Sequence, residues 1–126
     1  MTQFARKNVL ITGGASGIGR RMAEKIAGKG GTVIIWDIDQ KKLSHVESEL
    51  KKPGCNLFTY ICDVSDRKKV YFTAEQVKKD IGKVDILINN AGIVSGKPLL
   101  ECTDEQIEKT FQVNSLAFIW TIRAFL

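Results

Sequence analysis

Histidine, cysteine and proline are scarce in this chain of 126 residues, and each scarcity excludes a class of protein. The one histidine, His45, stands beside Leu43 and Val46 in a helix-like stretch, which indicates a surface or boundary position and not a metal ligand. The three cysteines include no C-x2-C pair, so we expect no metal site and no disulfide framework. Reduced thiols favour a cytoplasmic location. Two prolines and no low-complexity tract argue against long disordered linkers.

Long apolar runs and a dense patch of one charge are missing as well. No run approaches the roughly 18 residues that a membrane helix requires, and no charged segment followed by a long apolar core opens the sequence, so we expect no targeting segment. The net charge is +5, but the lysine pairs are spread over several predicted helices among acidic residues. A nucleic-acid interface more often forms one basic stripe. We therefore expect no nucleic-acid partner.

Four short apolar runs alternate with helix-like segments. The runs are VLIT (9–12), TVIIW (32–36), LFTYI (57–61) and VDILI (84–88), and they are typical of buried parallel strands. Helical spacing relates Ile18, Met22, Ile26 and Ala27 in the first interval. Asp39 and Ser65 stand where they would cap the second and third helices. A T-x-x-Q capping box at Thr103 begins a fourth, which can continue through the apolar end of the chain.

This alternation predicts an α/β fold. Its sheet is parallel and doubly wound (Rossmann-like), because strands joined through helices run parallel with right-handed crossovers. We expect about four strands in the order 3-2-1-4, within a single domain over residues 1–126.

A glycine-rich turn, TGGASGIG (12–19), joins the first strand to the first helix. Glycine lets the backbone turn sharply and approach a phosphate without a Cβ in the way. The N–H groups at the start of the helix suit a pyrophosphate. Together they predict a dinucleotide site at the carboxyl ends of the strands.

Asp37 ends the second strand, where a carboxylate can accept hydrogen bonds from an adenosine ribose. Alternatively, it only starts the next turn. Its charge would repel a 2′-phosphate, and neither Ser16 nor Ile38 supplies a cation. These residues favour NAD over NADP.

With further motifs in the same order, the whole chain resembles the short-chain dehydrogenase/reductase family. The family's T-G-x3-G-x-G turn is matched by Thr12, Gly13, Gly17 and Gly19, its N-N-A-G signature by 89–92, and its helix asparagine by Asn114. The cofactor-binding residues that the resemblance implies are Thr12, Gly13, Ser16, Gly17, Ile18, Gly19, Asp37, Asp63, Val64, Asn90, Ala91 and Gly92. Asp63 is expected to accept from the adenine amino group or, alternatively, to start a helix. Asn89 is expected to tie strands together.

A narrower resemblance is to the retinol and hydroxysteroid dehydrogenase branch. It rests on the strings WDI (36–38), VDILINNAGIVSGK (84–97) and IEKTFQVNSLAFIWTIRAFL (107–126). It implies hydride transfer between a nicotinamide cofactor and an alcohol or ketone on a retinoid, steroid or other lipophilic small molecule. A homo-oligomer is expected for the complete enzyme. Many members carry a membrane anchor, but only MTQFARKN (1–8) precedes the first strand, so no anchor is expected here.

The family's catalytic serine and its Tyr-x3-Lys pair find no match. Val64 stands four residues after Tyr60, and Glu75 stands four after Tyr71. Only Asn114 remains of the catalytic set, as a support for a proton relay. We interpret the chain as the amino-terminal, cofactor-binding part of an NAD-dependent oxidoreductase.

Alone, the chain is expected to be poorly soluble and to have no dehydrogenase turnover, because its fourth strand and the segment LAFIWTIRAFL would lie uncovered. The alternative interpretation is a non-catalytic dinucleotide-binding or protein-interaction module.

Overall fold

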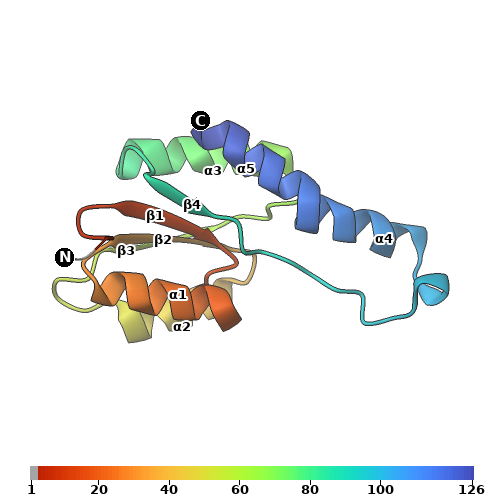
Figure 1. Cartoon of the computed structure of the whole chain (residues 1–126), viewed down its shortest axis with the longest axis horizontal. Helices are drawn as coiled ribbons and strands as arrows, with labels where there is room; N and C mark the ends of the chain where they lie inside the picture. Colours follow the sequence, from red (N-terminus) through yellow and green to blue (C-terminus); the bar gives the residue numbers. More distant parts are fainter. Residues whose placement is uncertain (1–2) are drawn as a thin grey trace.

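A computed structural model describes residues 3–126, and Met1 and Thr2 of the amino-terminal segment lie outside the described part. One parallel sheet carries the strands β1 (Asn8–Thr12), β2 (Thr32–Asp37), β3 (Leu57–Ile61) and β4 (Ile86–Ile88). Their order is β3-β2-β1-β4, which confirms the predicted doubly wound topology (Figure 1). In register, Thr12 pairs with Trp36 and Ile11 with Ile88. The carboxyl ends of β1, β2 and β4 therefore meet at one edge of the sheet.

The fourth strand is shorter than the run VDILI predicts. Asp85 meets β1 through its carboxylate, whose Oδ2 accepts a hydrogen bond from the Asn8 N–H at 2.8 Å. The Asn8 side chain in turn donates to the Lys83 carbonyl at 2.7 Å. The Asp85 N–H also donates to the Asn8 carbonyl at 2.9 Å, directly before the paired residues, which begin with Ile86 opposite Val9.

Helices cover both faces of the sheet. Helices α1 (Gly17–Gly28) and α2 (Gln40–Leu50) lie on one face, and α3 (Arg67–Asp80) and α5 (Ala117–Phe125) lie on the other (Figure 1). Because successive strand side chains point to opposite faces, the strands contribute to two hydrophobic cores, one on each face of the sheet. Val9, Ile11, Val33 and Ile35 pack toward α1 and α2, while Leu10, Ile34 and Trp36 pack toward α3 and α5.

A long segment returns from β4 to the sheet. A 3-10 turn, η1 (Leu99–Glu101), precedes α4 (Asp104–Phe111), which continues through the π-helical turn η2 (Gln112–Leu116) into α5. The expected capping box of α4 is present, with the Gln106 N–H donating to the Thr103 hydroxyl and the Gln106 side chain accepting from the Thr103 N–H. The outer side of this helix leaves apolar side chains exposed, namely Phe111, Leu116, Ile119 and Ile122.

Of the predictions for the two helix caps and for Ile18, one was confirmed and two were wrong. Asp39 caps α2, but the cap of α3 is Asp66 instead of Ser65, because the Asp66 carboxylate accepts from the N–H groups of Lys68 and Lys69. Ile18 is 74% exposed and does not belong to the apolar side of α1.

The buried residues of α1 are Gly19, Ala23 and Ile26. Helical spacing counted from these residues places Ile18 on the outer side. As predicted, His45 lies at the surface, with its side chain 63% exposed and its Nε2 2.8 Å from the Glu49 carboxylate.

No helix between residues 3 and 126 combines the length and apolarity needed to cross a membrane.

Candidate functional site

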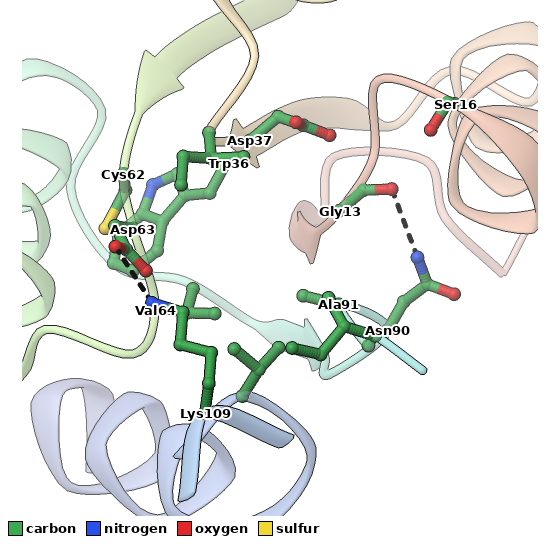
Figure 2. Close-up of a pocket in the computed structure, with 14 residues that line it drawn as sticks. Gly13, Ser16, Trp36, Asp37, Cys62, Asp63, Val64, Asn90, Ala91 and Lys109 are labelled. Carbon is green, nitrogen blue, oxygen red and sulfur yellow. Dashed lines mark hydrogen bonds and ion pairs between the residues drawn. The ribbon is translucent and has the colours of Figure 1, made fainter. Parts of the chain in front are cut away.

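A groove with a volume of about 360 Å³ opens at the carboxyl edge of the sheet (Figure 2). Residues from the first turn, the ends of β2 and β3, the loop after β4, and α4 with η2 line it together. They are Gly13, Ser16, Trp36, Asp37, Ile38, Cys62, Asp63, Val64, Asn90, Ala91, Gly92, Ile93, Lys109 and Val113. Of the predicted cofactor residues, Thr12, Gly17, Ile18 and Gly19 are outside this lining.

The glycine turn is packed too closely for side chains. A Cβ on Gly19 would lie 2.4 Å from the Gly13 carbonyl oxygen, which no real Cβ tolerates. Gly13 has φ +65° and Gly17 has φ +56°, in the left-handed region that favours glycine. The start of α1 therefore lies directly against the end of β1.

The buried hydroxyl of Thr12 and the side chain of Asn90 join the ends of β1 and β4. Thr12 Oγ1 accepts from the N–H groups of Asn90 and Ala91 at 3.0 and 3.1 Å. Asn90 Nδ2 donates to the carbonyls of Thr12 and Gly13, both at 3.1 Å. The tie expected of Asn89 is thus made by Asn90, while Asn89 Oδ1 accepts from the Thr121 hydroxyl at 2.7 Å and so connects the loop to α5.

Asp37 holds its carboxylate at the groove edge through two backbone contacts. Its Oδ2 accepts from the Ala15 N–H at 3.2 Å, and its Oδ1 accepts from the Asp39 N–H at 3.0 Å. In this one conformation, Asp37 can both stabilise the turn after β2 and offer its carboxylate to a ligand in the groove. Each carboxylate oxygen has a second lone pair for a ligand hydroxyl.

Basic side chains that the sequence motifs did not predict lie beside the glycine turn. Lys41, Lys42 and His45 of α2 line a shallow depression together with Ser16, Gly17 and Arg20. The only signal in the sequence was their position in the first turns of the helix that follows Asp37. Motif spacing alone did not show that α2 runs beside the turn.

Lys109 is a further residue that the motifs did not predict, and it projects from α4 toward Asp63 (Figure 2). Its Nζ lies 3.5 Å from Asp63 Oδ2 and donates to the Ser65 hydroxyl at 2.6 Å. Burial by itself raises the pKa of Asp63, but hydrogen bonds from Ser65 and the charge of Lys109 outweigh burial and hold that pKa below its usual value. Asp63 thus stays ionised at neutral pH.

Asn114 lies in the π-helical turn and binds the loop after β4. Its Oδ1 accepts from the Ile93 N–H at 2.8 Å, and its Nδ2 donates to the Ile93 carbonyl at 2.7 Å. Neither tyrosine lines the groove. The Tyr60 hydroxyl donates to the Asp80 carboxylate at 2.9 Å, and burial, with Asp80 second, raises its pKa to about 12. In residues 3–126, the groove has no tyrosine to exchange a proton with a substrate.

A parallel sheet with this turn, this carboxylate and this groove is typical of dinucleotide-binding α/β domains. The chain belongs to the short-chain dehydrogenase/reductase family, since the family profile described as short chain dehydrogenase matches residues 7–126.

Curated relatives point to one branch of the family. The chain is 46% identical to epidermal retinol dehydrogenase 2 of Homo sapiens, over 96% of this chain and 41% of that protein. It is 42% identical to retinol dehydrogenase 10 of Rattus norvegicus, over 93% of this chain and 42% of that protein. The chain therefore spans about two fifths of the length of these relatives.

Solved structures share the fold closely. A short chain dehydrogenase/reductase from Burkholderia phymatum in complex with NAD superposes with a TM-score of 0.92 at 33% identity, over 99% of this chain and 44% of that one. An NAD+-bound xylitol dehydrogenase superposes with a TM-score of 0.90 at 27% identity, over 98% of this chain and 48% of that one. The family and these neighbours support a nicotinamide cofactor.

Proposed function

We propose that this chain forms the cofactor-binding part of an NAD-dependent oxidoreductase that acts on an alcohol or a ketone. The observation that carries the proposal is the joint placement of the glycine turn and the Asp37 carboxylate at the edge of one groove. The bound cofactor would supply the hydride. The residues present fit the cofactor, because Gly13, Ser16 and Asp37 line one groove at the carboxyl edge of the sheet, where a dinucleotide binds in this kind of fold.

Each predicted residue group has a distinct task in this proposal. The turn around Gly13 and Gly17 receives the pyrophosphate at the start of α1. Asp37 accepts from the ribose hydroxyls, and Asp63 accepts from the adenine amino group. Thr12 and Asn90 hold the two strand ends at the correct separation.

NAD is proposed over NADP because the Asp37 carboxylate lies where a 2′-phosphate would be repelled. Lys41, Lys42 and His45 are the observation in favour of NADP, since they lie beside Ser16. They line a different depression from Asp37, however, and the groove itself includes neither lysine.

The substrate proposed is a small lipophilic molecule with a hydroxyl or carbonyl group, such as a retinoid. Support comes from the relatives whose names are retinol dehydrogenase. Asn114 is proposed as a support residue, because it fixes Ile93 at the groove. Without the family's catalytic serine and its Tyr-x3-Lys pair, these 126 residues by themselves are expected to show no turnover. A cytoplasmic location and a homo-oligomeric complete enzyme remain part of the proposal.

Binding of NADH and NADPH tests the proposal. Trp36 lines the groove, so energy transfer from its indole to a bound reduced nicotinamide reports binding. The Trp120→Phe background removes the other tryptophan. A solubilising fusion partner keeps the chain in solution. Asp37→Asn is the test variant, and Asp104→Asn, an exposed carboxylate of α4, is the matched control.

The unsubstituted chain is expected to bind NADH more tightly than NADPH. Asp37→Asn should weaken NADH binding about tenfold, because it removes a charge-assisted hydrogen bond, and should reduce the preference over NADPH. Tighter binding of NADPH by the unsubstituted chain would refute the NAD preference. A folded chain that binds neither nucleotide would favour the interaction module, which the exposed apolar side chains of α4 and α5 support.

A further inference from the structure

Lys109 belongs to a three-residue network that crosses the groove from α4 to the loop after β3. The lysine Nζ donates to Ser65 Oγ at 2.6 Å, and Ser65 Oγ donates to Asp63 Oδ1 at 2.6 Å. The Ser65 N–H donates to the same Oδ1 at 3.0 Å. The lysine ammonium also lies 3.5 Å from Asp63 Oδ2. Figure 2 shows the lysine side chain reaching from its helix to Asp63.

This network determines which oxygen of Asp63 is available to a ligand. Oδ1 receives both hydrogens of Ser65, so its lone pairs are used within the protein. Oδ2 has only the longer ion-pair contact and keeps accepting capacity at the groove. The side chain of Asp63 is 27% exposed, and the contacts from two elements limit its rotation.

We propose that Lys109 is a positioning residue that holds Asp63 with Oδ2 toward the amino group of adenine. The groove then selects adenine over hypoxanthine, which carries a carbonyl oxygen at that position and would face the carboxylate with like polarity. This inference rests on the proposed function, since it assigns a base preference to the same nucleotide site. Lys109 acts through Asp63 and does not itself contact the base.

The test compares two reduced dinucleotides that differ only in the base. Dissociation constants for NADH and for reduced nicotinamide hypoxanthine dinucleotide are measured by energy transfer from Trp36. The variants are Lys109→Met, the conservative Lys109→Arg, and Lys79→Met, an exposed lysine of α3 outside the groove, as control. Circular dichroism melting verifies that each variant is folded, and Lys109→Gln replaces Lys109→Met if the latter fails to fold.

Lys109→Met is expected to weaken NADH binding about tenfold, because Asp63 is no longer held toward the base and its charge-assisted contact with the adenine amino group is lost. Binding of the hypoxanthine analogue should change less than about twofold. Lys109→Arg should restore most of the preference, and Lys79→Met should change neither constant. In an Asp63→Ala background, Lys109→Met should have no further effect on the preference.

Equal weakening of both dinucleotides by Lys109→Met would overturn the inference, because it would show a purely structural role for the lysine. An unchanged NADH constant would overturn it as well. In both cases NADH still binds to the unsubstituted chain, so the proposed function stands. Failure of the folded, unsubstituted chain to bind NADH would overturn the proposed function and this inference with it.

Discussion

Replacing Gly19 with alanine should destabilise the chain by about 2 kcal/mol, although alanine is the better residue inside a helix. The helix preference alone favours alanine by about 1 kcal/mol. Against it stands the contact of the new Cβ, at 2.4 Å from the Gly13 carbonyl oxygen and 2.5 Å from Asn90 Nδ2. Neither atom is the free end of a flexible side chain.

Both contacted groups are held by other bonds. The Gly13 N–H donates to the Trp36 carbonyl at 2.7 Å, and Asn90 Nδ2 donates to the carbonyls of Thr12 and Gly13. Overpacking at such a site costs about 2 kcal/mol. The Asn90 bond that must lengthen adds about 1 kcal/mol. Subtracting the helix preference leaves a net loss of about 2 kcal/mol.

Urea unfolding followed by circular dichroism measures this loss. The matched control is Gly28→Ala at the other end of the same helix, where a Cβ would meet nothing within 4 Å. That variant should be neutral or gain up to about 1 kcal/mol. Gly17→Ala separates conformation from contact, because the site is open but φ is +56°, and it should lose about 1 kcal/mol. Equal stabilities of Gly19→Ala and Gly28→Ala would refute the close approach.

Three further predictions follow from buried or paired groups. Thr12→Val should lower the unfolding free energy measured in urea by about 3 kcal/mol, because two N–H groups lose their acceptor. Thr12→Ser keeps the hydroxyl and should keep most of the stability. A smaller loss for Thr12→Val than for Thr12→Ser would contradict the role of these hydrogen bonds. The pKa of Asp63 lies below its reference value of 3.8, so its stabilisation is present above that pH and is lost as pH falls through the lower folded value. In the Asp63→Asn variant, the unfolding free energy should therefore fall less steeply below about pH 4. If its pH dependence in that range is unchanged, the contacts of Asp63 with Ser65 and Lys109 do not stabilise the fold. Burial raises the pKa of Cys62 to about 11, so iodoacetamide at pH 8 should label the partly exposed Cys55 and Cys102 before Cys62 in the folded chain, as measured by peptide mass spectrometry.

Much of the fold can be predicted from local patterns of the sequence. The apolar runs, the glycine turn and the capping box at Thr103 each depend on neighbours in the chain, and the strand order follows from the βαβ connection rule. Motif order also predicts that Gly13, Asp37 and Asn90 meet, because the carboxyl ends of parallel strands share one edge of the sheet.

The tertiary structure alone determined how the groove is held together. Lys109 and Ser65 are 44 residues apart, and no periodicity links them until α4 packs beside the β3 loop. Likewise, Asn90 instead of Asn89 binds the end of β1, and Ile18 faces solvent because the close contact of Gly19 fixes the rotation of α1. Patterns in the sequence identify hydrogen-bond partners within a few residues, whereas contacts between distant segments depend on the relative placement of packed elements, which only the folded chain defines.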